Sequence, residues 1–288
     1  MRVIAAHDAE RLARNIVIPP RPALLDQLQQ LIHQADPDPA QIAVVVGQDL
    51  SLTAAVIKVA NSPLYGLEQK VATAPQAIQL LGQQNVLQIL SGLMLRAAIG
   101  QATQPAQAAR LEQFWHDSTQ VAMISAMISK SLSGLSAEEC YSFGLFRDCG
   151  IPVMMLRFAD YLKTLALAEA ARCEQFPLIE NQFHDCDHVR IGYMVARAWL
   201  LPEELAQAIL HHHEDPTLFQ QTDASLSRVV TLVAVARLAD HVQHTLQHAI
   251  QDSQWQKEDG AALLSWLGLT PTDYEDLRDA IHQRFHQH

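Results

Sequence analysis

Apolar residues recur along most of the chain with the spacing of an amphipathic α-helix. Between residues 24 and 32 they stand at positions i, i+1, i+4, i+7 and i+8, which lie on one helical face. Residues 50–60 and 86–99 have a similar pattern. Alternation with a period of two, which would indicate half-buried strands, is scarce. The pattern therefore predicts an all-α protein.

Several predicted helices have a recognisable first turn. Asp38 precedes Pro39, Ser136 is followed three positions later by Glu139, and Thr270 precedes Pro271. In each case a short polar side chain can accept a hydrogen bond from the otherwise unpaired N–H groups of a first turn. These signals predict that helices begin at residues 39, 137 and 271.

Two polar breaks divide the chain. Residues 100–105 form a short polar stretch that contains proline, and residues 251–260 form another. The long amphipathic segment 106–130 lies between them and predicts a central helix. We expect the first break to be a joint between two helical parts, and the residues after the second break to form helices that pack on the rest.

Composition limits the classes of function. The chain has 288 residues, 49% of them hydrophobic, and a formal net charge of −11. Because no cluster of Lys and Arg could follow a phosphate backbone, we expect no direct binding of nucleic acid. No segment is apolar enough for a membrane span, and the start does not resemble a signal peptide, so we expect a cytoplasmic protein. The four cysteines form no Cys-x-x-Cys pair, and we expect buried thiols.

Short motifs follow one another in an order that resembles a known family. They are Ile18-Pro19-Pro20-Arg21-Pro22, Asp49-Leu50-Ser51-Leu52-Thr53, Ala60-Asn61-Ser62-Pro63-Leu64-Tyr65-Gly66, Ala77-Ile78-Gln79-Leu80-Leu81-Gly82, Phe143-Gly144-Leu145-Phe146-Arg147-Asp148-Cys149-Gly150, Asp187-His188, Trp199-Leu200-Leu201-Pro202 and His211-His212-His213. This succession resembles the HDOD family, whose domain is a divergent relative of the HD and HD-GYP metal-dependent phosphohydrolases. The resemblance implies an HD-like helical bundle with an N-terminal helical subdomain. We expect these parts at residues 104–250 and 14–103, with 251–288 packing on them.

The resemblance also implies where a metal site would lie, and here the chain departs from the HD pattern. HD enzymes gather His and Asp side chains around one or two divalent metal ions. The place of the first histidine is taken by Asp117, while His116 is one residue, or about 100° of helix, away. The histidine of the eponymous pair is replaced by Arg147, which cannot ligate a metal. We expect Arg147 to form an ion pair with Asp148 that ties two helices together. Asp117 could bind a metal ion, but we expect it to be solvated or to cap a helix.

Five residues still match metal-binding positions of the related enzymes: Asp148, His188, His212, His213 and Asp240. They are either vestigial ligands that converge on one point or a buried hydrogen-bond network. Because consecutive helical residues point about 100° apart, His211, His212 and His213 cannot all face one pocket of a continuous helix.

Further histidines lie outside this pattern. His241, His244 and His248 are spaced i, i+3 and i+7 and would share one helical face, which is more typical of a solvated face than of a metal site. We expect the terminal His286 and His288 to be exposed.

Two main functions follow from the resemblance. The first is a non-catalytic module of bacterial signal transduction that acts on a protein partner or a small ligand and needs no cofactor; a ligand sensor built on the old catalytic cleft is a variant of it. The alternative is a phosphohydrolase of nucleotides or phosphodiesters with an altered ligand set, which would need a divalent ion such as iron, manganese or zinc. Arg147 would then serve as a phosphate clamp. No catalytic residue is assigned.

Overall fold

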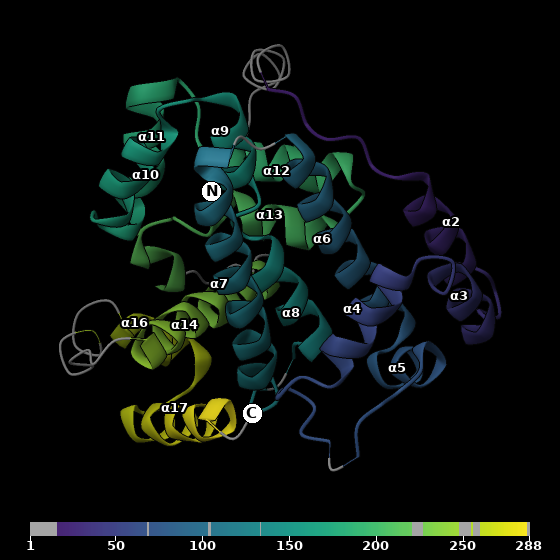
Figure 1. The fold of residues 1–288 in the computed structure, drawn as a ribbon. Helices are drawn as coiled ribbons and strands as arrows, with labels where there is room; N and C mark the ends of the chain where they lie inside the picture. Colours follow the sequence, from purple (N-terminus) through teal and green to yellow (C-terminus); the bar gives the residue numbers. More distant parts are fainter. Residues whose placement is uncertain are drawn as a thin grey trace.

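All secondary structure in the part of the chain that the computed structural model describes is helical (Figure 1). The described residues are 16–67, 69–102, 105–132, 134–220, 227–247, 255 and 260–286, and they contain no strand. The prediction of an all-α fold is confirmed. Residue 14, His248, His288 and most of the polar break at 251–260 lie outside the described residues.

The helices fall into three consecutive groups along the chain. The first group is α2 (Ala23–Ile32), α3 (Pro39–Val46), α4 (Leu50–Ala60), α5 (Ala74–Leu81) and α6 (Gln83–Ala102). The second is α7 (Pro105–Ser129), α8 (Ala137–Phe146), α9 (Gly150–Arg157), α10 (Tyr161–Glu169), α11 (Phe176–His184), α12 (His188–Ala198), α13 (Glu203–His211) and α14 (Ser227–Gln247). The third is α16 (Gly260–Leu267) and α17 (Pro271–His286). Two 3₁₀ turns, η1 (Cys173–Gln175) and η2 (Pro216–Gln220), complete the described elements.

The predicted helix starts are confirmed. The Asp38 carboxylate accepts a hydrogen bond of 2.8 Å from the N–H of Ala40. Ser136 and Glu139 form a reciprocal capping box at the start of α8. The Thr270 hydroxyl accepts a bond of 3.1 Å from the N–H of Asp273 at the start of α17. The long segment predicted at 106–130 is α7.

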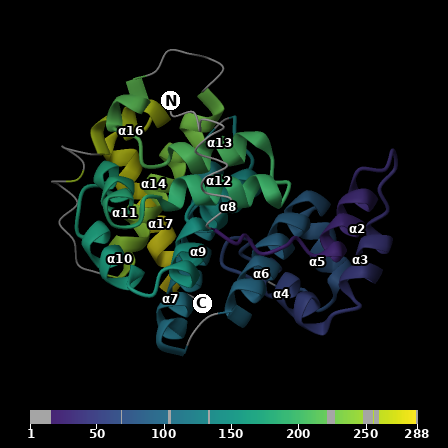
Figure 2. The same ribbon diagram turned by 90° about the horizontal axis from the view of Figure 1, so that it is seen from above.

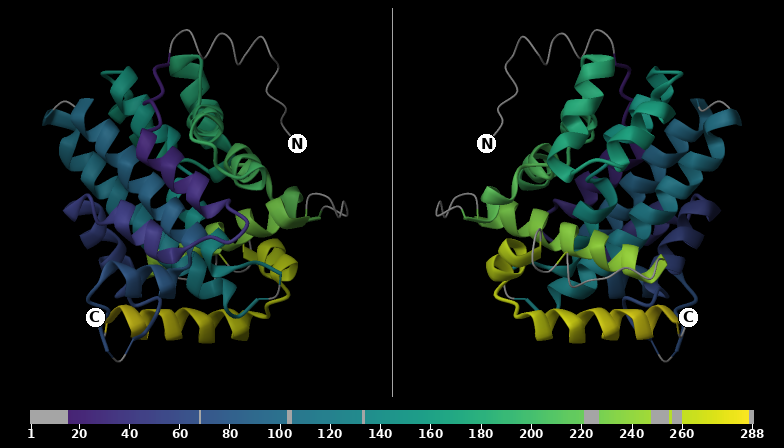
Figure 3. Two further views of the ribbon diagram at one scale, coloured as in Figure 1. Left: turned by 90° about the vertical axis from the view of Figure 1, so that its right-hand side faces the viewer. Right: turned by 90° about the vertical axis from the view of Figure 1, so that its left-hand side faces the viewer.

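The second group forms the bundle that positions the site. Helices α2 to α5 lie to one side of α6, as Figure 2 shows, and α7, α8 and α14 pack against one another on the other side. A Cβ atom at Gly144 would lie 2.6 Å from Cα of Ala122, so this glycine lets α8 approach α7 closely. Helix α17 runs along the base of the molecule, where it contacts α7 (Figure 3).

A short extended segment ties the N-terminal helices to the bundle. The indole N–H of Trp199, at the end of α12, donates a hydrogen bond of 2.9 Å to the carbonyl of Pro19. In return, Nε of Arg21 donates a bond of 3.0 Å to the carbonyl of Trp199. The prolines before α2 thus hold an extended backbone that fits against the bundle.

The expectation of buried thiols is wrong for one cysteine. Cys140, Cys149 and Cys186 are buried, but Cys173 is exposed because it lies in the η1 turn at the surface. Among the described residues, no helix combines the length and the apolar character that crossing a bilayer requires.

Candidate metal centre

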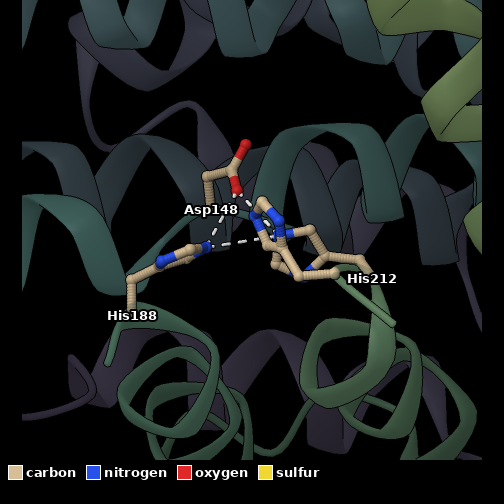
Figure 4. A group of neighbouring side chains, drawn as sticks. Asp148, His188 and His212 are labelled. Atoms are coloured by element: carbon tan, nitrogen blue, oxygen red, sulfur yellow. Dashed lines mark hydrogen bonds and ion pairs between the residues drawn. The ribbon is translucent and has the colours of Figure 1, made fainter. Parts of the chain in front are cut away.

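Four side chains from three separate helix ends meet at one point of the bundle. Asp148 lies in the turn between α8 and α9, His188 is the first residue of α12, and His212 and His213 directly follow α13. One ligand atom from each lies within 4.8 Å of the others. Figure 4 shows Asp148, His188 and His212 pointing toward one another. The sequence analysis predicted all four residues as candidates.

Local backbone geometry explains how these ends come together. A Cβ atom at Gly150 would lie 2.0 Å from the carbonyl oxygen of His188, so only glycine allows α9 and α12 to begin this close to one another. Asp187 caps α12 by accepting a hydrogen bond of 2.9 Å from the N–H of Arg190. This cap fixes the position of His188 at the helix start.

The paired histidines differ from the expectation for a continuous helix. Helix α13 ends at His211, so His212 and His213 are in the following turn and both line the cleft. His211 points elsewhere and lies 3.4 Å from the carboxylate of Glu214. The expectation that the three histidines cannot share one pocket is therefore met, and the end of the helix allows two of them to do so.

The distances within the group suit a shared cation. Oδ1 of Asp148 lies 2.9 Å from Nε2 of His212 and 3.5 Å from Nε2 of His188. The two Nε2 atoms are 3.4 Å apart. Two nitrogen ligands bound at about 2.1 Å to one ion, at a nearly tetrahedral angle, would be separated by about this distance.

Each histidine is held through its other ring nitrogen. Nδ1 of His188 lies 2.7 Å from the carboxylate of Glu180, Nδ1 of His212 lies 2.7 Å from the carbonyl of Ile209, and Nδ1 of His213 lies 2.5 Å from the carbonyl of Cys173. Because these partners only accept, each Nδ1 must carry a proton and donate it. When the ring is neutral, the lone pair of Nε2 is therefore free to bind a metal ion. Metal-binding histidines are commonly held in this way through their other nitrogen.

Glu180 is a partner that the sequence analysis missed. Its side chain is fully buried, and one oxygen accepts from both the backbone N–H of His188, at 2.9 Å, and the ring. The other oxygen accepts from the hydroxyl of Tyr161. Nothing in the local sequence distinguishes this glutamate from those on helix surfaces, and only the packing of α10, α11 and α12 brings it to the site.

Burial and charge set the protonation of the group when no metal is bound. Burial disfavours an ionised Asp148, but the charge of Arg147 and the neighbouring His188 and His212 outweigh it, so the pKa of Asp148 lies well below its usual range. Burial lowers the pKa of His212, and burial together with the neighbouring imidazoles holds the pKa of His213 well below its usual range. Both rings are therefore neutral at pH 7, as metal ligands must be.

His188 behaves differently. Burial opposes its charge, but the carboxylates of Glu180 and Asp148 outweigh burial and raise its pKa to about 10. In the metal-free chain a proton on Nε2 therefore sits between Asp148 and His212. Since Nε2 of the neutral His212 presents a lone pair to Asp148, the group requires a cation at this point, either that proton or a metal ion.

The fifth candidate, Asp240, forms an ion pair with Arg147. Its Nε donates to Oδ2 of Asp148 at 2.8 Å, its Nη2 to Oδ1 of Asp240 at 2.5 Å, and its Nη1 to the carbonyl of Ala236 at 3.3 Å. The predicted ion pair is confirmed, and it joins the end of α8 to α14. The structure thus places Asp240 beside Arg147 rather than among the four convergent ligands.

Asp117 lies inside α7 and is partly exposed. Its Oδ1 accepts hydrogen bonds from the side-chain amides of Gln113, at 2.9 Å, and of Gln243 and Gln247, both at 3.2 Å. The expected capping role is wrong, because Asp117 lies inside α7, whereas its partly exposed carboxylate agrees with the solvated alternative and also accepts from glutamines of α7 and α14. His116, the neighbour that could not replace the ligand, is not part of the group.

The remaining histidines fall outside the centre. His241 stacks on Trp255 with ring centroids 3.8 Å apart, and His244 lines the same cleft as the four ligands. His286 is exposed, as expected. The cleft itself has a volume of about 490 Å³ and is also lined by Arg110, Arg147 and Arg237.

Arg237 fixes the turn that carries two of the ligands. Its guanidinium donates to the carbonyl of His212 at 2.7 and 2.9 Å, and also to the carbonyl of Glu214. The ring of Phe219 lies under it, 5.4 Å away. No motif or spacing in the sequence marks this arginine.

A family model for the HDOD domain matches residues 18–215. The chain belongs to the HDOD family. An uncharacterised protein of Treponema pallidum (strain Nichols) is 24% identical over 238 residues, which is 82% of this chain and 45% of that protein. The HDOD chain therefore spans less than half the length of this curated relative.

Solved structures share the HDOD fold. A protein of Shewanella amazonensis SB2B, provisionally assigned as a phosphohydrolase, superposes with a TM-score of 0.67 at 19% identity, with 97% of this chain and 94% of that chain covered. A protein of Marinobacter aquaeolei VT8, provisionally assigned to signal transduction, superposes with a TM-score of 0.63 at 17% identity, with 98% and 60% covered. At these identities the likeness concerns the fold alone.

Proposed function

We propose that this HDOD chain is a regulatory module of signal transduction that binds one divalent metal ion and does not hydrolyse phosphoesters. Asp148, His188, His212 and His213 would hold the ion. The module would act on a protein partner or a small ligand, and the name of the Marinobacter protein agrees with a signalling role.

The observation that carries the proposal is the placement of Arg147. Its guanidinium lies between Asp148 and Asp240 and donates to both carboxylates, where the HD pattern has an imidazole and a metal ion. A fixed organic cation bridges the two carboxylates but cannot bind and activate water as a metal ion does. Arg147 therefore replaces half of a two-metal centre and leaves the other half intact.

The four remaining ligands fit a metal ion of intermediate softness. Three neutral imidazoles and one carboxylate suit zinc, iron or manganese better than calcium or magnesium, which prefer oxygen ligands. When bound, such an ion supplies a Lewis acid and lowers the pKa of a coordinated water. In this chain the ion would also join the ends of α8, α12 and α13, and so would make the shape of the bundle depend on metal binding.

A second candidate is a phosphohydrolase with a single metal ion, as the name of the Shewanella protein suggests. One observation favours it: the four ligands line a cleft large enough for a small phosphoester. Against it, Arg147 is fully engaged by Asp148, Asp240 and Ala236, and Arg110 is paired with Glu169. Neither guanidinium is free to serve as a phosphate clamp without breaking an ion pair.

Metal content and turnover, measured on the same untagged preparation, test the proposal. We expect about one equivalent of metal per chain, its loss in His188→Ala, and no hydrolysis of bis(p-nitrophenyl) phosphate or cyclic dinucleotides. Turnover that disappears in Asp148→Ala would support the phosphohydrolase instead. Metal-free protein after growth and refolding with zinc, iron and manganese salts would contradict both functions.

A further inference from the structure

A second cavity lies where the N-terminal helices meet the bundle. It has a volume of about 200 Å³ and is lined by residues of α6, α8, α14 and the start of α13. None of the described residues that line it also lines the metal cleft. Cavities at junctions between packed parts of a chain are frequent sites for small ligands. We call it the junction cavity.

The junction cavity is strongly acidic. Glu138, Glu139 and Glu204 line it, and none of the described residues in its wall is Lys or Arg. Glu139 caps α8 and is paired with Arg228 at the surface. Within the described part of the chain no hydrogen bond or ion pair holds Glu138 or Glu204. Two carboxylates are therefore available to a ligand.

The neighbouring cations do not neutralise these two carboxylates by contact. Lys130 lies within electrostatic range of Glu138, but its ammonium donates to the carbonyl of Leu64. Arg228 lies within range of Glu204, but its guanidinium contacts Glu139. These cations offset part of the negative charge, but neither contacts the carboxylates of Glu138 and Glu204, which remain accessible to a ligand.

Buried amide oxygens provide a second, independent indication. Asn85 is only 2% exposed and lines the cavity. Its amide N–H donates to the hydroxyl of Tyr65 at 3.2 Å, whereas its Oδ1 accepts no hydrogen bond. Oε1 of Gln88, one turn further along α6, is likewise buried and without a donor. A buried carbonyl oxygen without a hydrogen-bond donor is unfavourable. A ligand that donates hydrogen bonds to these two oxygens would therefore be stabilised here.

The rest of the wall determines the kind of donor. Pro202, Leu205 and Leu232 contribute apolar surface beside the carboxylates and amides. A hydrated metal ion gains nothing from such walls, whereas the methylene groups of an organic cation would be shielded from water by them.

We propose that the junction cavity binds a small organic cation, namely a primary amine or guanidinium on a short hydrocarbon chain. The charged group donates to Glu138, Glu204 and the amide oxygens, and the hydrocarbon part packs on the leucines. Such a ligand contacts α6 on one side and α8 and α13 on the other, so it stabilises one arrangement of the N-terminal helices on the bundle. This inference does not depend on the metal centre.

Calorimetric titration of the full chain with agmatine, and separately with putrescine, tests the proposal. At least one of the two should bind saturably with a stoichiometry of one. The double variant Glu138→Gln/Glu204→Gln should weaken this binding by about tenfold or more, because each change removes a hydrogen bond to a charged group. The control Glu275→Gln/Asp276→Asn removes the same charge from the exposed face of α17 and should leave the affinity unchanged.

Two results would overturn the proposal: no saturable binding of either amine, or equal affinity in the double variant and the control. Both glutamates are exposed, so their replacement leaves the fold intact. Titration with magnesium is a further check. Magnesium binding that is lost in the double variant, without amine binding, would make this a metal site and would also contradict the proposal.

Discussion

Arg147 and Asp240 join the end of α8 to α14 through an ion pair of 2.5 Å. Asp148 is shared, since it accepts from Arg147 through one oxygen and lies against His212 through the other. The carboxylate therefore links a fixed cation to the candidate metal centre.

Replacing Arg147 should be strongly destabilising. Arg147→Met leaves Asp148, whose side chain is only 17% exposed, without its cation, whereas Asp240 is 43% exposed and can be solvated. We therefore expect a loss of about 2–3 kcal/mol in the free energy of unfolding. Arg96→Met is the matched control, because the Arg96–Glu112 pair is exposed. It should cost about 1 kcal/mol or less. Urea denaturation measures both, and equal effects would contradict a structural role for the Arg147 bridge.

Glu180 should control metal affinity. Glu180→Gln keeps the shape of the side chain but replaces the charged acceptor for the N–H at Nδ1 of His188 by a neutral amide. We therefore expect the affinity for the metal ion to fall about 10- to 100-fold. Glu169→Gln alters a carboxylate that lines the cleft and pairs with Arg110 instead of a histidine, and should leave metal affinity nearly unchanged. Competition with a chromogenic chelator compares the two. An unchanged affinity in Glu180→Gln would show that His188 is not held for metal binding.

Gly150 should tolerate no side chain. The methyl group of Gly150→Ala would overlap the carbonyl of His188, so α9 or α12 must move, at a cost of about 1–3 kcal/mol or more. Gly100→Ala, in α6 with open space around the added carbon, should instead stabilise the protein by up to about 1 kcal/mol. Thermal unfolding distinguishes the two. A harmless Gly150→Ala would mean that α9 and α12 are not in close contact.

The metal-free protein should be most stable near pH 6.5. The pKa of His188 is raised to about 10 in the folded state, so the folded chain binds more protons than the unfolded chain between pH 6.5 and 10, and stability falls as pH rises through that range. His212 and His213 have lowered pKa values, so stability also falls as pH drops below about 6.5. Urea midpoints of chelator-treated protein across pH measure both limbs. A midpoint that rises steadily from pH 7 to 10 would contradict the raised pKa of His188.

The sequence predicted those features that depend on local signals. The first turns at Asp38, Ser136 and Thr270, the central helix α7 and the contact of Arg147 with Asp148 all follow from neighbouring residues. The four convergent ligands came from the family pattern. The boundaries proposed between the parts of the chain remain a prediction.

Features that depend on tertiary packing could not be predicted. Glu180 and Arg237 come to the centre from other helices, and no spacing in the sequence marks them. His212 and His213 both face the cleft because α13 ends at His211, so the two residues lie in the following turn and not on a helix. Asp117 lies among three glutamines, two of which are more than a hundred residues away.

The most direct test of the account is a crystal structure of protein grown with zinc, with anomalous scattering recorded at the zinc edge. The account predicts one peak, bound by Asp148, His188, His212 and His213, with Arg147 still bridging Asp148 and Asp240. Two peaks flanking Asp148, with Arg147 displaced, or no peak at these residues, would contradict it.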